Sequence, residues 1–432
     1  MIILYIFVTI ICLFYLCTCL RVPIVIWYYN RIKKRVAKYK EKDYTEFWIL
    51  LPALREQKLV KETIEYFNNL NYNANKLHIC LITTQKEEFE YNQKNQITKT
   101  TRDVVLSYLK ENKTKYNTCL IHYPEEKGNK ASQLNYAIKK ITESSNNDCY
   151  FVIFDFDSRP STDFLITTNK TIELYNQPDL LQPIPFFLKN AEKLSTNIKN
   201  TPIIIHGMEQ SCRSGCIEIW NLMMNSCKLP LSPIYAMGAC LCIKKSALIE
   251  QDYIPEPVDD LPLGFRYFIN KKNFHLVPSI VLGDLPDTMK KVLNQSILIQ
   301  KGNLLAIKEI TRKGTAKHNL WRRLLILWEF LTVFFSKTIL PYFLLLFAIF
   351  NIVNFHFISI IIFSLPFFRY LAGVIIMRKL ACQKIKLKTF ILGFFLCFIS
   401  PFCLTYGPIK NIQLEIKKKL KKVDISYKKT ER

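Results

Sequence analysis

The region between Tyr44 and Pro286 alternates short apolar runs with amphipathic stretches, and this alternation constrains the fold more than any other feature. The apolar runs FWILLP, LHICLITT, NTCLIHYP and CYFVIFDFD have the length and composition of buried strands. The stretches QKLVKETIEYFNNL, TTRDVVLSYLK and ASQLNYAIKKI, which lie between them, carry apolar residues at helical spacing. Alternating strands and helices predict an α/β domain with a mostly parallel, doubly wound sheet, and ligands of such sheets bind beyond the carboxyl ends of the strands.

The fourth apolar run ends in a pair of aspartates, Asp155 and Asp157. Side chains alternate along a strand, so both carboxylates are expected on the same side. Two neighbouring carboxylates repel each other unless a cation neutralises them. Oxygen ligands suit Mg²⁺ or Mn²⁺, which can also hold a diphosphate. The pair therefore predicts a clamp for a metal-bound nucleotide, and two solvated loop aspartates are the alternative.

The composition of the chain points to membrane segments. Hydrophobic residues make up 50% of the 432 residues, yet the formal net charge is +25. These values agree if the apolar residues are concentrated in membrane spans and the lysines line the cytoplasmic membrane surface. Nucleic-acid binding is disfavoured, because the basic runs flank apolar segments and no recognition module is present. The 14 scattered cysteines favour buried thiols in a reducing compartment over a disulfide framework or a metal site.

The predicted organisation follows from these composition shifts. Residues 1–29 are expected to be an N-terminal transmembrane anchor, and the basic NRIKKRVAKYK after it places the next domain in the cytoplasm. The α/β domain covers 44–287, amphipathic interfacial helices cover 288–335, a transmembrane region covers 336–406, and a basic cytoplasmic tail covers 407–432. The expectation is a multi-pass protein of the cell membrane. Three C-terminal spans would leave the basic tail outside, so the segment containing Pro401 is expected to be re-entrant or interfacial.

A series of motifs occurs in a fixed order between about Phe47 and Asn303: LPALREQKLVKETI, GNKASQLNYAI, VIFDFDSRPSTDFL, LLQPIPFFLKN, MGACLCIKKSAL and VDDLPLGFRYFINKKNFHLV. Together they resemble the membrane-bound glycosyltransferases of family 2, which include cellulose, chitin, hyaluronan and poly-N-acetylglucosamine synthases. The resemblance implies a GT-A-like nucleotide-sugar-binding domain and an inverting sugar transfer that depends on Mg²⁺ or Mn²⁺. It also implies a nucleotide-sugar donor, expected to be a UDP-sugar, and a membrane-associated glycan or a lipid-linked acceptor.

The same resemblance implies roles for individual residues. Asp260 matches the general base, with Asp259 beside it and Arg266 orienting the acidic pair. The residues implied in nucleotide-sugar binding are Pro52, Glu56, Lys130, Asn135 and Asp155. Asp155 and Asp157 are implied as the metal ligands, and Gln182, Gly238 and Gln295 are implied on the acceptor side.

Two departures from the family pattern affect the expected specificity. Thr83 or Thr84 stands where many relatives have an aspartate that contacts the base, so the pattern is not diagnostic of uridine. The segment QSILI keeps Gln295 of the Gln-x-x-Arg-Trp motif of processive synthases but not its arginine or tryptophan, and this predicts few sugar additions. A processive polysaccharide synthase is the alternative enzyme. A catalytically inactive membrane scaffold that retains the fold is the alternative of another class, although Asp155, Asp157 and Asp260 argue against it.

Overall fold

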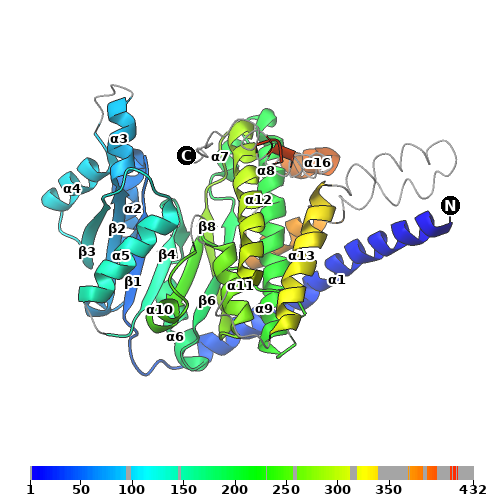
Figure 1. The fold of residues 1–432 in the computed structure, drawn as a ribbon, viewed down its shortest axis with the longest axis horizontal. Helices are drawn as coiled ribbons and strands as arrows, with labels where there is room; N and C mark the ends of the chain where they lie inside the picture. Colours follow the sequence, from blue (N-terminus) through cyan, green and yellow to red (C-terminus); the bar gives the residue numbers. More distant parts are fainter. Residues whose placement is uncertain are drawn as a thin grey trace.

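A computed structural model describes most of the chain (Figure 1). The described residues are 2–93, 99–144, 147–229, 231–255, 260–311, 319–338, 368, 370–382, 387–396, 409–410, 412–414 and 416. Asp259 and the larger part of the predicted segments 336–406 and 407–432 lie outside these ranges.

The centre of the structure is an 8-stranded mixed sheet in the order β3-β2-β1-β4-β7-β6-β8-β5. Its strands are β1 (Phe47–Pro52), β2 (Leu77–Thr84), β3 (Asn117–Tyr123), β4 (Tyr150–Phe154), β5 (Arg159–Pro160), β6 (Leu180–Phe187), β7 (Cys240–Lys244) and β8 (Phe274–Gly283). The pairs β2–β3, β1–β2, β1–β4 and β6–β8 are parallel. The pairs β4–β7, β6–β7 and β5–β8 are antiparallel. The α/β class is confirmed, but the sheet is mixed rather than mostly parallel.

Helices pack on both faces of the sheet (Figure 1). Their bounds are α1 (Ile2–Lys38), α2 (Val60–Asn68), α3 (Gln85–Gln93), α4 (Thr101–Glu111), α5 (Lys130–Ser144), α6 (Phe164–Leu174), α7 (Ala191–Leu194), α8 (Thr201–Cys212), α9 (Ile219–Ser226), α10 (Lys245–Glu250), α11 (Leu261–Ile269), α12 (Met289–Thr311), α13 (Leu320–Thr338) and α16 (Leu387–Leu396), with a π-helical turn at Arg213–Glu218 between α8 and α9. Buried residues of α5 share one core cluster with α1, α9 and α11, and buried residues of α2, α4 and α6 form a second cluster.

The strand register brings the ends of several elements together. β1 lies between β2 and β4 and is parallel to both, so the carboxyl ends of these three strands lie at the same edge of the sheet. β7 runs antiparallel to β4 and pairs Cys240 with Phe154. The start of β7 therefore lies beside the end of β4, and the loop before Cys240 meets the turn that begins at Asp155.

The structure corrects the prediction of transmembrane helices. Within the ranges that the structure describes, no helix is both long enough and apolar enough to cross a membrane. The prediction of N- and C-terminal transmembrane helices in a multi-pass cell-membrane protein is wrong on this finding, which covers α1 but not the larger part of 336–406, outside the described residues. In the described second half of α1, the apolar side chains of Val22, Val25 and Tyr29 are buried in the core cluster that also contains α5. Packing against the α/β domain therefore accounts for these apolar positions.

Candidate active site

A lysine at the start of α5 joins the end of β4 to the loop before β7. Lys130 donates from Nζ to Asp155 Oδ1 at 3.1 Å and to the carbonyl oxygen of Gly238 at 2.8 Å. The Lys130 and Asp155 side chains are 20% and 23% exposed, so both are largely shielded but still reach solvent. Three segments that are distant in the sequence therefore meet at one cation. The structure therefore brings Lys130, Asp155 and Gly238 close together.

The loop before β7 is shaped by Gln182, which is fully buried in β6. Its Oε1 accepts from the Met237 N–H at 2.9 Å, and its Nε2 donates to the Cys240 carbonyl at 2.7 Å. Gln182 was expected on the acceptor side. Its contacts instead place it beneath the loop, where it sets the position of Gly238.

Asp260 lies on the other side of the same loop. It caps the N-terminus of α11 by accepting from the Leu261 N–H at 2.7 Å, and its Oδ2 accepts from the Gly238 N–H at 3.4 Å. Gly264 lets α11 approach this closely, because a Cβ there would lie 2.4 Å from the Ala236 nitrogen. Gly238 therefore contacts Lys130 through its carbonyl and Asp260 through its N–H.

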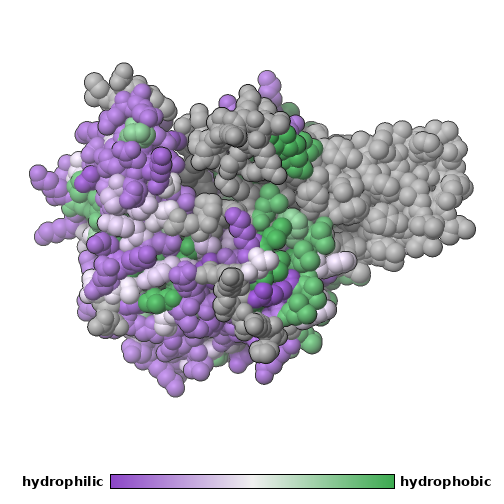
Figure 2. All heavy atoms as spheres, viewed as in Figure 1, coloured by the Kyte–Doolittle hydropathy of each residue, from purple (hydrophilic) through white to green (hydrophobic). Residues whose placement is uncertain are grey.

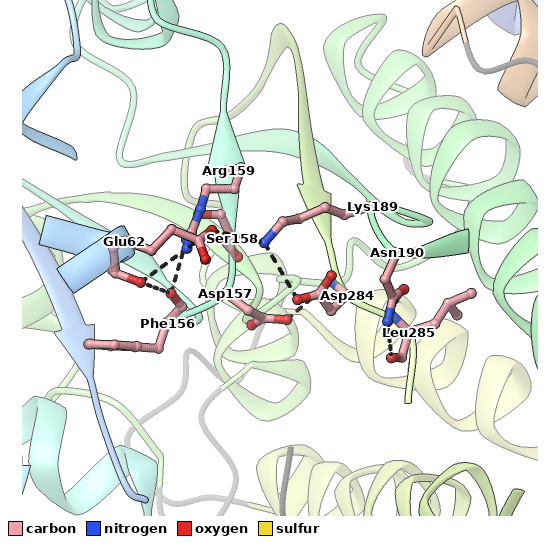
Figure 3. Close-up of polar contacts among 10 residues, drawn as sticks. Glu62, Phe156, Asp157, Ser158, Arg159, Lys189, Asn190, Asp284 and Leu285 are labelled. Atoms are coloured by element: carbon pink, nitrogen blue, oxygen red, sulfur yellow. Dashed lines mark hydrogen bonds and ion pairs between the residues drawn. The ribbon is translucent and has the colours of Figure 1, made fainter. Parts of the chain in front are cut away.

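Asp157 occupies a more enclosed position on the same turn (Figure 3). It is 2% exposed, and its Oδ2 accepts from the Asp284 N–H at 3.1 Å. The Asp284 side chain turns to Lys189, with 3.5 Å between Oδ2 and Nζ. The backbone just after β8 thus supports a carboxylate that comes from the end of β4.

Arg159 stabilises the turn that carries both aspartates. Its Nη1 donates to the carbonyls of Phe156 and Ser158, and its Nη2 donates to Glu62 Oε1 at 2.9 Å (Figure 3). Partial burial would raise the pKa of Glu62, but the hydrogen bond and charge of Arg159, together with the charge of Lys189, lower it below its ordinary value. The turn is therefore held by ionised groups outside the pair of aspartates.

The loop after β1 is organised around a buried carboxylate that the sequence did not reveal. Glu87 is 1% exposed and accepts from the Arg55 N–H at 3.0 Å, from Gln57 Nε2 at 2.7 Å and from the Thr101 N–H at 2.8 Å. Arg55 has a φ of 61°, which a non-glycine residue adopts only when its surroundings hold it there. Glu87 thereby fixes the loop that runs from Pro52 to Glu56.

Two of the residues implied in nucleotide binding lie on that loop. Pro52 ends β1, and Glu56 is 7% exposed, with its N–H donating to Thr101 Oγ1 at 2.9 Å. Thr84 is buried at the end of the neighbouring strand β2. This edge of the sheet is the expected place for a nucleotide, since it lies beyond the carboxyl ends of parallel strands.

Other implied residues have contacts that differ from their expected roles. Asn135 clamps the backbone of Ile254, accepting from its N–H at 3.0 Å and donating to its carbonyl at 2.9 Å. Arg266 was expected to orient the acidic pair. It is 4% exposed and forms a two-point ion pair with Glu309, with distances of 2.9 and 3.0 Å. It also donates to the carbonyls of residues 251–253, so its role is to hold that turn against α12.

Gln295 lies on α12, and its Oε1 is buried without a hydrogen-bond partner among the residues that the structure describes. Its described contacts therefore do not connect it to the loop at Gly238.

The two carboxylates of Asp155 and Asp157 suit a hard divalent cation when a bound ligand supplies further oxygen atoms. Among the described residues, no group of three or more His, Cys, Asp or Glu side chains is arranged to hold a metal ion. Asp155 and Asp157 supply carboxylate oxygens, which are the ligands that Mg²⁺ and Mn²⁺ prefer. Mg²⁺ is commonly bound by one or two carboxylates together with substrate phosphates and water. The two aspartates fit this pattern.

Comparison with known proteins gives similarities at the level of structure. No protein-family model matches the chain. A search of curated proteins also gives no match. Among solved structures, the chain is similar to a mannosyltransferase from Pyrobaculum calidifontis in complex with GDP-Man and Mn²⁺, with a TM-score of 0.44 and 12% identity over 94% of this chain and 99% of that one. It is also similar to S. aureus TarS 1-349 in complex with UDP-GlcNAc, with a TM-score of 0.41 and 12% identity over 90% and 98% of the two chains. The function proposed below rests on the geometry of this chain's own residues.

Proposed function

We propose that the protein is a nucleotide-sugar glycosyltransferase that acts with Mg²⁺ or Mn²⁺ and inverts the anomeric centre. The observation that carries the proposal is a connected set of contacts: Lys130 donates to Asp155 and to the Gly238 carbonyl, and Asp260 accepts from the Gly238 N–H. A cation beside a carboxylate at a strand end suits a diphosphate with its metal, and a second carboxylate across the same loop suits an acceptor hydroxyl. The motif order in the sequence supports the same assignment.

The donor side uses charge to bind and release the diphosphate. Asp155 and Asp157 would hold the divalent cation, which when bound neutralises the negative charge of the departing nucleoside diphosphate. Lys130 adds a positive charge at the same place, and positive groups aimed at developing charge stabilise a transition state. Pro52, Glu56 and Thr84 lie at the adjoining sheet edge, where we place the nucleoside. Uridine is proposed as the base from the motif resemblance.

The acceptor side uses Asp260. Attack of an acceptor hydroxyl oxygen on the anomeric carbon forms the new glycosidic bond as the bond to the diphosphate breaks. Asp260 accepts the hydroxyl proton during this displacement, and general-base assistance of this kind contributes about 10²–10⁴ in rate. Attack from the face opposite the leaving group inverts the anomeric configuration.

The proposed acceptor is a glycan on a lipid or at a lipid surface. Helix α13 exposes an apolar stripe in which both tryptophans are more than half exposed; its members are Leu320, Trp321, Leu324, Leu327, Trp328 and Leu331. Their spacing places them along one side of the helix. In Figure 2, hydrophobic residues gather over the region of α13. An apolar face next to α11, the helix capped by Asp260, supports an acceptor with an apolar part.

The direct experiment incubates the purified protein with Mn²⁺, a panel of radiolabelled nucleotide sugars and a lipid extract, and identifies the labelled product. Transfer of one or a few sugars to a lipid is the expected result, and the Asp260→Asn protein is the negative control. Long polymer formed beside unused acceptor would support a processive synthase instead. Absence of both transfer and metal-dependent nucleoside diphosphate binding would support an inactive scaffold and contradict the proposal.

A further inference from the structure

The backbone segment that supports Asp157 is itself clamped by an asparagine. Asn190 donates from Nδ2 to the Leu285 carbonyl at 2.8 Å, and its Oδ1 accepts from the Leu285 N–H at 2.8 Å (Figure 3). The preceding residue adds a third bond, from the Lys189 N–H to the Gly283 carbonyl at 3.0 Å. Asp284 lies between these two anchored residues, so the direction of its N–H is set by the residues that follow β6.

Helix α8 closes the other side of this segment. A Cβ at Gly207 would lie 2.3 Å from Leu285 Cδ2 and 2.9 Å from the Phe187 carbonyl oxygen, so only glycine permits the observed approach. Leu285 is 3% exposed. A backbone segment packed this tightly has little room to shift, and its N–H therefore has a fixed position relative to Asp157.

The side chain and the backbone N–H of Asp284 make different contacts. Its carboxylate pairs with Lys189, which also lies 3.6 Å from Glu62 Oε1. The backbone N–H of the same residue donates to Asp157 Oδ2 at 3.1 Å. A hydrogen bond to a carboxylate fixes its orientation, and a fixed orientation favours metal binding.

We propose that Asn190 is a positioning residue for the metal-binding carboxylate of Asp157 and acts through the backbone N–H of Asp284. The inference rests on the proposed function, because it assumes that Asp157 holds the cation. Outer groups that orient a metal ligand typically change metal affinity by about 10- to 100-fold when they are removed. Asn190→Ala should weaken Mn²⁺ binding within that range.

The structure supplies a matched control away from the site. Asn169 in α6 clamps the segment before β1, because its Oδ1 accepts from the Thr45 N–H at 3.0 Å and its Nδ2 donates to the Asp43 carbonyl at 2.8 Å. Asn169→Ala removes the same number of hydrogen bonds to the backbone. It should therefore lose stability to a similar extent as Asn190→Ala while leaving the affinity for Mn²⁺ close to that of wild type.

The experiment measures free Mn²⁺ by electron paramagnetic resonance during titration of the full-length protein, with UDP or GDP present as the probe. Thermal unfolding and circular dichroism establish that each variant is folded. Wild type and Asn169→Ala should have similar Mn²⁺ affinities, and Asn190→Ala should bind Mn²⁺ more weakly by about 10- to 100-fold. Asp284→Asn is included because it keeps the N–H and removes the charge that pairs with Lys189.

Four outcomes would overturn the inference. Equal Mn²⁺ affinity in wild type and Asn190→Ala would show that the clamp does not act on the metal site, and the proposed function would stand. Equal weakening in Asn190→Ala and Asn169→Ala would show a general loss of stability. Equal weakening in Asp284→Asn would assign the effect to that carboxylate. Absence of Mn²⁺ binding by the wild-type protein would overturn the proposed metal dependence together with the inference.

Discussion

Lys130 at the start of α5 and Asp155 after β4 form an ion pair with 3.1 Å between Nζ and Oδ1, and the same ammonium group donates to the Gly238 carbonyl. This relationship ties the donor side of the proposed site to the loop that also contacts Asp260. A lysine, an aspartate and a glycine from three motifs are thus joined through one ammonium group.

Replacing Lys130 by methionine should lower turnover by about 10²–10³, because the departing diphosphate loses one source of positive charge. The measurement is the initial rate of sugar transfer at saturating donor. Lys140→Met is the matched control, since Lys140 lies on the same helix with its side chain 56% exposed and pairs only loosely with Glu143 at 3.9 Å. Equal rates in the two variants would remove Lys130 from the mechanism.

Asp157→Asn should abolish most metal-dependent binding of nucleoside diphosphate while the protein stays folded. Asparagine retains an oxygen that can accept the Asp284 N–H, so the local hydrogen bond survives and only the charge is lost. Isothermal titration with UDP and Mn²⁺ measures the effect, and the exposed Asp163→Asn is the control. Wild-type activity that persists in the presence of a chelator would count against a metal-binding role for Asp157.

Asp260→Asn should lower turnover by about 10²–10⁴ with little change in the affinity for nucleoside diphosphate and metal. Aspartate and asparagine are similarly good N-caps, so the bond to the Leu261 N–H and the start of α11 should be preserved. Single-turnover rates and diphosphate binding are measured on the same preparation. Near-normal turnover would place the base elsewhere, and Asp259 would be tested next.

Removing one partner of the Arg266–Glu309 pair should destabilise the protein by about 3–5 kcal/mol, because a buried charge is left without compensation. Both side chains are less than 10% exposed. Urea unfolding of Arg266→Met and Glu309→Met measures the loss, and the double variant should recover part of it. Additive losses in the double variant would mean that the two side chains do not act as a pair.

Glu218 should make stability depend on pH. Burial raises its pKa from an ordinary value of 4.5 to about 8, the Arg213 guanidinium at 3.6 Å opposes this, and the carboxylate of Glu329 adds to it. Tyr235 is another titratable residue near Glu218, and its hydroxyl donates to Glu329 at 2.6 Å. The folded protein therefore holds the Glu218 proton more tightly than the unfolded chain does.

The sign of the effect follows from this difference. The stability contributed by Glu218 is fully present below pH 4.5 and is lost as the pH rises through its folded pKa of about 8. Glu218→Gln removes the titration, so wild type should lose stability relative to this variant by at most about 1.4 kcal/mol for each pH unit in that window. Urea unfolding of both proteins at several pH values measures the difference. A constant difference across the window would contradict the prediction.

The local hydrophobic pattern of the sequence was sufficient to predict the first half of the sheet. The strands β1 to β4 and the helices α2, α4 and α5 lie where hydrophobic spacing predicted them, because periodicity reports which face of an element is buried. The meeting of Lys130 and Asp155 could also be predicted, since both follow from motifs at the carboxyl edge of a parallel sheet. The apolar residues Val22, Val25 and Tyr29 of α1 were misleading, because burial in a protein core and burial in lipid require the same residue types.

The remaining features depend on which distant segments meet, and the sequence by itself contains little information on that. Three of these features join segments that are far apart in the sequence. β7 pairs antiparallel with β4, Asn135 bonds to Ile254 119 residues away, and Arg266 pairs with Glu309 43 residues away. A buried polar side chain needs a hydrogen-bond partner, and the packing of the folded chain determines which groups are near enough to serve. For this reason the sequence determined the residue types of the site and their order. Only the tertiary structure decided that Gln182, Asn135 and Arg266 hydrogen-bond to distant backbone segments, and that Asn190 and Asp284 lie next to Asp157.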